Sequence, residues 1–316
     1  MIKNKLKRLW SEGRPTLNGW LSIGNPFTAE IMAAQGYDSI SIDVQHGALD
    51  YSSVLPMFQA MRASGVVPMA RVPWLEPGII MKVLDAGAYG VICPMVNTPE
   101  QASEFVSYVR YPPLGQRSFG PTRANFSAGA NYAAEANDEI LAFAMIETRA
   151  ALAALDEILA VPGIDGVFVG PSDLAASLGL LGQQTHPEVT DAVARAFAAV
   201  IAAGKPVGVN AFDPAVAQSY LDAGAAFEHR RAHVIDEDEG SHAARLQGGH
   251  RAAHFEAAAQ VVGAWLDQRG HGGSVAIWQG PQHASATIGG AAFMRDDPLR
   301  PVGLRVGAAC LTATPR

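Results

Sequence analysis

Cysteine, lysine and long apolar runs are all scarce in this chain of 316 residues. The two cysteines, Cys93 and Cys310, form no CxxC motif and no disulfide framework. No apolar run approaches the roughly 18 residues that span a membrane, and residues 1–13 lack the apolar stretch of a secretory signal. The net charge of −7 comes without a basic stripe, which argues against a nucleic-acid partner. We therefore expect a cytoplasmic enzyme that acts on small molecules, and we exclude disordered, collagen-like and membrane proteins.

Short apolar runs alternate with amphipathic segments, a pattern typical of α/β proteins. The runs predict parallel strands covered on both faces, at 17–24, 38–45, 66–72, 90–96, 142–148, 166–170 and 206–212. Helix start signals lie between them at Asp50, Pro77, Thr98 and Pro187. Seven βα units in about 225 residues predict a (β/α)8 TIM barrel, with an eighth strand near 224–227. A doubly wound sheet is the alternative, but the first turn, GNPFTAE, is not GxGxxG.

The composition changes after Phe227. Residues 228–316 hold seven of the nine histidines, nine arginines and twelve glycines, but no lysine, and a helix is plausible at 254–266. We therefore divide the chain into a barrel domain, 1–227, and an atypical tail, 228–316. The tail has three open interpretations: a disordered segment, the product of a reading frame that changed near Phe227, or a genuine extra module. Because Glu228, His229 and Arg230 interrupt the apolar pattern, we expect 228–316 to be mobile or irregularly folded.

Four of the predicted strands end at, or lead directly into, residues that can do chemistry: His46, Arg71, Glu147 and Asp173. The carboxyl ends of barrel strands form the active face, so these side chains should meet there. Each alone has a structural explanation: a helix cap for either carboxylate, a structural histidine, or an ion-pair partner for Arg71. Their joint occurrence at one end of the barrel favours a functional site. Asp43, three residues before His46, could orient its imidazole and make it a general acid–base.

The residue types at this mouth favour metal-assisted chemistry. Two carboxylates without a His or Cys cluster suit Mg²⁺ or Mn²⁺ better than Zn²⁺. Such a cation facing an arginine could bind a 2-oxo acid and stabilise its enolate. A Schiff-base aldolase would need a lysine at the mouth. Lysine occurs only before the barrel (Lys3, Lys5, Lys7), in a predicted helix (Lys82) and ahead of the seventh strand (Lys205), so carbonyl chemistry here would use a metal.

An ordered series of motifs over residues 5–227 resembles one enzyme family. The motifs are WLSIGNP, IDVQHG, MARVPW, VLDAG, RYPPLGQRS, MIET and GVFVGPSDLAASLG. They resemble the metal-dependent (class II) pyruvate aldolases of the HpcH/HpaI aldolase/citrate lyase family, such as 4-hydroxy-2-oxoheptane-1,7-dioate and 2-dehydro-3-deoxyglucarate aldolases. The resemblance implies a carbon–carbon lyase that cleaves a 4-hydroxy-2-oxo acid reversibly to pyruvate and an aldehyde through a metal-bound enolate. It also implies a homo-oligomer, a hexamer, with a role in the catabolism of aromatic compounds.

The same resemblance assigns roles to individual residues of this chain. Glu147 and Asp173 match metal ligands, with Mg²⁺ or Mn²⁺ as the first expectation and Co²⁺ or Zn²⁺ as alternatives. Arg71 matches the group that stabilises the enolate, and His46, paired with Asp43, matches a base that acts through water. The remaining matches are Gln45 and Asp85 near the metal-bound waters, and Trp20, Ser172 and Asn210 at the substrate.

The chain also departs from this family pattern. The family often has Glu in place of Gln45, so a negative charge near the metal is missing, and an apolar residue in place of Asn210, which predicts a more polar aldehyde. The family's last strand and helix, which pack against a neighbouring subunit in many members, find no match after Phe227. Two other functions remain open: a CoA-thioester lyase of the citramalyl or malyl type, and a non-catalytic barrel. The short GNPFTAE loop argues against the first and the retained site residues against the second.

Overall fold

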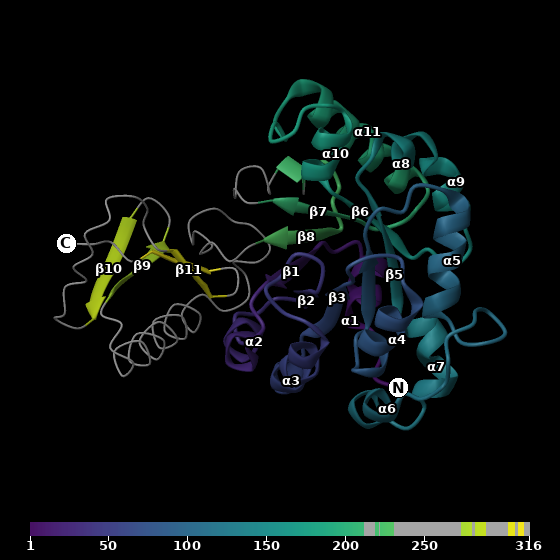
Figure 1. Ribbon diagram of the computed structural model, residues 1–316, viewed down its shortest axis with the longest axis horizontal. Helices are drawn as coiled ribbons and strands as arrows, with labels where there is room; N and C mark the ends of the chain where they lie inside the picture. The colour runs from purple at the N-terminus through teal and green to yellow at the C-terminus, as the bar shows by residue number, and fades with distance from the viewer. Residues whose placement is uncertain are drawn as a thin grey trace. The chain divides into compact units, whose positions relative to one another are not determined.

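Eight parallel strands close into a barrel in the computed structural model of the chain (Figure 1). The structure describes residues 1–211, 219–220 and 222–230, together with four strands between residues 273 and 312. The strands pair in chain order from β1 to β8, and β8 pairs with both β7 and β1. The predicted (β/α)8 barrel is therefore confirmed.

The barrel strands follow the apolar runs of the sequence. They are β1 (Thr16–Leu21), β2 (Ser39–Asp43), β3 (Val67–Arg71), β4 (Gly90–Cys93), β5 (Leu141–Ile146), β6 (Gly166–Val169), β7 (Val207–Ala211) and β8 (Phe227–Arg230). All residues of β2, β4, β5 and β6 are buried, as expected of strands covered on both faces. The eighth strand begins at Phe227 and not at residue 224. Its position is set by backbone pairing with Thr16–Asn18 and Gly208–Ala211, which an apolar pattern does not report.

Helices connect the strands on the outside of the barrel. They are α1 (Lys5–Ser11), α2 (Pro26–Ala33), α3 (Tyr51–Met61), α4 (Pro77–Asp85), α5 (Pro99–Val109), α6 (Thr122–Ala128), α7 (Tyr132–Glu139), α8 (Arg149–Ala153), α9 (Leu155–Ala160), α10 (Pro171–Ser177) and α11 (Pro187–Ala202), with a short 3-10 turn at Arg62–Ser64. The predicted start signals are confirmed: Asp50 accepts from the Ser52 N–H and Thr98 from the Gln101 N–H, while Pro77 and Pro187 stand at the first positions of their helices. None of the helices in the described ranges is long and apolar enough to cross a bilayer.

The chain divides into two compact units. The first, Met1–Ala33 with Tyr37–Arg230, contains the barrel, and the second consists of Ala34–Gly36 with Arg231–Arg316. In the second unit β9 (Gly273–Gln279) pairs antiparallel with β10 (Gln282–Ile288), and β11 (Gly303–Val306) pairs antiparallel with β12 (Ala309–Thr312). The helix expected at 254–266 lies outside the described residues, as does most of the tail expected to be irregular.

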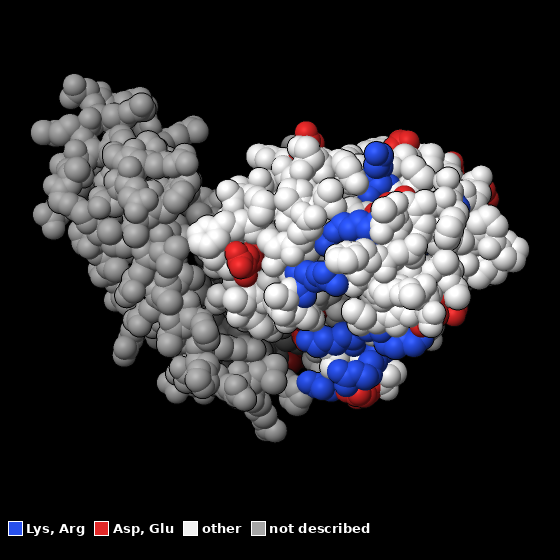
Figure 2. Space-filling view, turned by 90° about the horizontal axis from the view of Figure 1, so that it is seen from below, with Lys and Arg blue, Asp and Glu red and all other residues white. Residues whose placement is uncertain are grey.

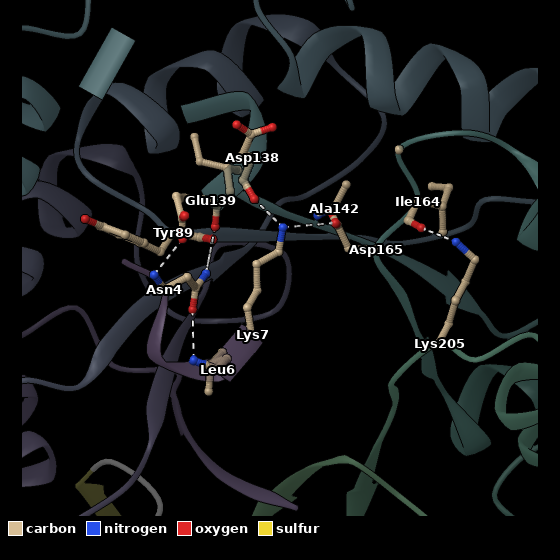
Figure 3. A network of polar contacts seen from close by, with 12 residues as sticks. Asn4, Leu6, Lys7, Tyr89, Asp138, Glu139, Ala142, Ile164, Asp165 and Lys205 are labelled. Atoms are coloured by element: carbon tan, nitrogen blue, oxygen red, sulfur yellow. Dashed lines mark hydrogen bonds and ion pairs between the residues drawn. The ribbon is translucent and has the colours of Figure 1, made fainter. Parts of the chain in front are cut away.

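The N-terminal segment covers the end of the barrel at which the strands begin (Figure 3). Asn4 is 2% exposed, and its side-chain oxygen caps α1 by accepting from the Leu6 N–H at 3.0 Å. Its side-chain amide donates to the Glu139 carbonyl at 2.8 Å, and its backbone N–H donates to Glu139 Oε2 at 2.7 Å. Trp10 Nε1 donates to the Ala226 carbonyl, next to β8, at 2.8 Å. These bonds tie the segment before β1 to α7 and to the last strand of the barrel.

Replacing Asn4 by alanine should lower the free energy of unfolding by about 2 kcal/mol, because a buried cap and a buried amide–carbonyl bond are lost together. For a chain of this size the melting midpoint should fall by roughly 4–8 °C. Circular dichroism of thermal unfolding measures this, with Arg8→Ala as the control because Arg8 is 62% exposed. Equal midpoints for Asn4→Ala and the control would show that the segment contributes little.

Candidate active site

The mouth of the barrel collects polar residues from four strands. β2 ends at Asp43 and β3 ends at Arg71, Glu147 directly follows β5, and Asp173 lies in the first turn of α10 after β6. Because the strands are parallel, these positions share one end of the barrel. The structure therefore brings together four of the residues predicted from the sequence.

Asp43 and Arg71 form a two-pronged ion pair between neighbouring strands. They are register partners on β2 and β3. Arg71 Nε donates to Asp43 Oδ1 at 2.9 Å and Nη2 donates to Oδ2 at 2.6 Å. Burial would raise the pKa of Asp43, but the hydrogen bonds and the charge of Arg71 outweigh it and the pKa is lowered. Asp43 is therefore a fixed anion that orients the guanidinium.

Trp20 supports this ion pair from inside the barrel. It is 5% exposed, its Nε1 donates to Asp43 Oδ2 at 3.1 Å, and its ring centre lies 4.9 Å from Arg71 Cζ. A guanidinium over an indole ring is attracted by the ring's electron density. Trp20, which was expected to contact the substrate, thus lies against Arg71 and helps to hold the guanidinium in place.

Glu147 is held by a closed ring of hydrogen bonds. Its Oε1 accepts from the Met95 N–H at 2.7 Å. Met95 has a left-handed φ of 56°, which costs a non-glycine residue roughly 1–3 kcal/mol. Asn97 holds this turn, because its Nδ2 donates to the Met95 carbonyl at 2.9 Å and its Oδ1 accepts from the Thr148 hydroxyl. One oxygen of the carboxylate therefore has a fixed position.

The other oxygen of Glu147 lies against Gly170. A Cβ on Gly170 would stand 2.6 Å from Oε2 and 2.9 Å from the Glu147 Cβ, closer than real contacts allow. A side chain at this position would displace the carboxylate. The glycine that begins the turn after β6 is thus needed for the position of Glu147.

The charge at this site is unbalanced. Burial and the neighbouring Asp173 raise the pKa of Glu147, the Met95 N–H and the Arg71 charge oppose them, and the net result is a pKa of about 7. Arg71 is itself engaged by Asp43. In the described part of the chain no group of three or more His, Cys, Asp or Glu side chains is placed to hold a metal. Two carboxylates, with water or substrate oxygens in the other positions, fit a hard divalent cation.

His46 and Gln45 meet Asp43 through their backbones. Both N–H groups donate to Asp43 Oδ1 at 3.2 Å. The His46 side chain is exposed and, among the described residues, its imidazole makes no hydrogen bond, so the expected pairing with Asp43 is made by the backbone. Gln45 Oε1 is buried without a partner in the described structure. An oxygen in that state is ready to accept a hydrogen bond from water or substrate.

The remaining predicted residues fall into two groups. Ser172 lies in the first turn of α10, where its hydroxyl accepts from Gln184 Nε2 at 3.2 Å, and Asn210 lies on β7 opposite His229 of β8. Asp85 is the last residue of α4, which runs back from the mouth, and its Oδ1 accepts from Arg117 Nη2 at 2.7 Å. Within this chain Asp85 therefore lies at the opposite end from Glu147.

The residues that hold Glu147 are not among those predicted from the sequence. The predicted site rested on charged residues at strand ends, whereas Met95 and Asn97, which follow β4, are uncharged. Thr148 could have been noticed as the cap of α8, because its hydroxyl accepts a hydrogen bond from the Ala151 N–H at 3.0 Å. No sequence signal marks a left-handed methionine.

Comparisons with known proteins identify the family of the chain. The sequence profile described as HpcH/HpaI aldolase/citrate lyase matches residues 18–234, more than half of the chain. The chain belongs to the HpcH/HpaI aldolase/citrate lyase family. The match continues past Phe227, where the resemblance had been expected to stop, and includes β8.

Members of this family resemble the chain over most of the barrel. A hydroxypyruvate/pyruvate aldolase of Rhizorhabdus wittichii is 47% identical over 208 residues, 65% of this chain and 83% of the relative. A 4-hydroxy-2-oxo-heptane-1,7-dioate aldolase of Salmonella heidelberg is 39% identical over 72% of this chain and 87% of its own length. The crystal structure of a family protein from Burkholderia cenocepacia has a TM-score of 0.69 and 34% identity, covering 81% of this chain and 99% of that protein.

Glu147 should give the metal-free protein an unusual pH dependence. Its pKa of about 7 lies above the ordinary 4.5, so the folded chain binds this proton more tightly than the unfolded chain. The stabilisation is full below pH 4.5 and is lost as pH rises to 7. Glu147→Gln should therefore be more stable than wild type at pH 8 in chelator, and this difference should shrink toward pH 4.5.

Urea unfolding across this pH range measures the difference, with the exposed Glu157→Gln as control. A gap between Glu147→Gln and wild type that is the same at every pH would contradict the shifted pKa.

Proposed function

We propose that this chain is a divalent-metal-dependent aldolase that reversibly cleaves a 4-hydroxy-2-oxo acid to pyruvate and an aldehyde. The observation that carries the proposal is the buried Glu147 beside Asp173, at a mouth whose arginine is already paired with Asp43. Family membership and relatives named as pyruvate aldolases support it. The names of several relatives also support hydroxypyruvate as a second product or nucleophile.

Glu147 and Asp173 would hold the cation, and carboxylate donors favour Mg²⁺ or Mn²⁺. When bound, the ion supplies Lewis-acid polarisation of the 2-oxo group. The protein's part is to keep the two carboxylates in place. For Glu147 the ring through Met95, Asn97 and Thr148 does this on one side and Gly170 leaves room on the other.

Arg71 would stabilise the negative charge that develops on the 2-oxo oxygen as the carbon–carbon bond breaks. Nε and Nη2 of Arg71 both donate to the Asp43 carboxylate, and the Trp20 ring lies against the guanidinium carbon. Nη1 remains for the substrate, because none of the described residues accepts from it. A guanidinium oriented in this way needs no rearrangement during the reaction.

In the cleavage direction the 4-hydroxyl group must lose a proton. Asp43 is a poor acceptor, because Arg71 engages both of its oxygens and lowers its pKa. The exposed imidazole of His46, anchored beside Asp43 by its backbone, would take the proton directly or through water.

The positions of the lysines support a mechanism without a Schiff base. Lys3, Lys5 and Lys7 lie before β1, and Lys205 Nζ donates to the Ile164 carbonyl at 2.6 Å, ahead of β6 (Figure 3). Lys82 lies on the outer helix α4, with its amine 5.2 Å from the centre of the Tyr51 ring. All five lysines are thus away from the inner mouth where Glu147 and Arg71 lie.

Two finer features belong to the same proposal. Asn210 on β7 favours an aldehyde with a polar substituent. By resemblance to its family, the protein would assemble as a homo-oligomer, a hexamer in the family pattern, and act in catabolism.

The cation can be tested by substitution and chelation. Glu147→Ala or Asp173→Ala should abolish cleavage, because a site with two protein ligands hardly keeps its ion with one. Chelator should inactivate the wild type, and Mg²⁺ or Mn²⁺ should restore it, measured as pyruvate released from a 4-hydroxy-2-oxo acid. Glu157→Ala, an exposed acid on α9, serves as the control. Full activity in excess chelator would rule out the metal, and turnover of a malyl-type thioester alone would favour the CoA-lyase alternative.

Arg71→Lys keeps the charge but loses the planar fork that joins Asp43 to the substrate oxygen. We expect turnover to fall by about 10²–10³, the size of losing one oxyanion donor. Exchange of the pyruvate methyl protons with deuterated solvent should fall in parallel, since it passes through the same enolate. Exchange at the wild-type rate alongside collapsed cleavage would give Arg71 a different role.

A further inference from the structure

A cavity of about 150 Å³ lies at the end of the barrel opposite the proposed active site. Its wall is built from the segment before β1, the end of α3, the start of β3, the turn before β4, and α6. These segments lie at the end of the barrel where the strands begin, whereas Glu147 and Arg71 lie where strands end. The cavity is therefore separate from the proposed active site.

The wall combines an apolar part with a cationic part. Phe58, Met61, Val66 and Val67 supply the apolar surface. The cationic side chains are Lys3, Lys5, Arg62 and Arg123, and none of the described residues that line the cavity is an Asp or a Glu. Lysine and arginine side chains gather on the face of the molecule seen from below in Figure 2, the side of the N-terminus and α6 in Figure 1.

The two lysines are neutralised by acids outside the cavity, but the two arginines are not. Lys3 pairs with Glu135 and Glu139, and Lys5 pairs with Asp38 at 2.8 Å. In the described part of the chain neither Arg62 nor Arg123 has a carboxylate partner. Arg62 instead lies over the ring of Phe126, with its Cζ 4.8 Å from the ring centre.

Arg123 is built into the wall despite this lack of a counter-charge. Its Nη1 donates to the Ala86 carbonyl and packs on Gly87, where a Cβ would stand 2.4 Å away. Burial and the repulsion of Arg62 both lower the pKa of Arg123. A half-buried guanidinium beside a second cation is unfavourable unless an anion accompanies the pair.

We propose that this cavity is a second ligand site that binds a small organic carboxylate, with its anionic group between Arg62 and Arg123 and its apolar body against Phe58, Met61 and Val66. The volume of the cavity is that of an apolar cavity known to hold a benzene ring. Two guanidinium groups match a carboxylate through charge-assisted hydrogen bonds. The site is independent of the proposed aldolase activity, so each can fail without the other.

The experiment uses benzoate as the probe and benzamide as its neutral isostere, with the full chain. Calorimetric titration should show benzoate binding, and the melting midpoint should rise with benzoate concentration. Arg62→Gln and Arg123→Gln should each weaken benzoate binding roughly tenfold, the usual effect of a lost charge-assisted bond. Arg195→Gln, an exposed arginine on α11, should leave it unchanged. Benzoate binding should be the same in wild type and in Glu147→Ala, because the cavity lies at the opposite end of the barrel from Glu147.

Four results would overturn the proposal. They are no benzoate binding by the wild type, equal binding of benzamide, an equal loss in Arg195→Gln, or loss of benzoate binding in Glu147→Ala. Arg62 is exposed, so Arg62→Gln keeps the test valid if Arg123→Gln does not fold. Pyruvate release should be the same in wild type and in Arg62→Gln, because the cavity lies at the other end of the barrel.

Discussion

The arrangement of the barrel mouth depends on one unfavourable feature, the burial of the Glu147 carboxylate beside a second carboxylate. Glu147 is 2% exposed and receives one backbone hydrogen bond, from Met95. The nearby guanidinium is committed to Asp43 in two-pronged geometry, so it does not neutralise Glu147 and Asp173. A buried carboxylate without a counter-charge shifts its pKa upward or binds a cation. The raised pKa thus marks a carboxylate that a bound cation would stabilise.

Several local features of the chain make sense as ways to hold this carboxylate. Met95 takes a left-handed conformation and aims its N–H at Oε1, and Asn97 ties that turn to Thr148, the residue after Glu147. Gly170 leaves the space that Oε2 occupies. The Asp43–Arg71 pair, backed by Trp20, then places a fixed positive charge at the same mouth. Holding a cation and stabilising an anion thus fall to residues on different strands, Glu147 after β5 and Arg71 on β3.

The sequence predicted what depends on local pattern. Continuous apolar runs located the strands. Because His46 and Glu147 follow β2 and β5, and Arg71 ends β3, these three residues could be placed at one mouth. Met95 and Asn97 could not be foreseen, because their role arises from a left-handed turn that no glycine marks. Asp85, assigned by resemblance, joins Arg117 at the far end because α4 runs back from the mouth. The start of β8 escaped prediction because strand pairing, rather than apolar alternation, sets it.

The most direct test of this account is the number of protons released when the metal-free protein binds Mn²⁺. Calorimetric titration in buffers of different ionisation enthalpy gives that number at each pH. With a Glu147 pKa of about 7, the account predicts release of about one proton per ion at pH 6 and almost none at pH 8.5. Glu147→Gln should release none at either pH. Binding of Mn²⁺ at pH 6 without proton release, or no binding at all, would contradict the account.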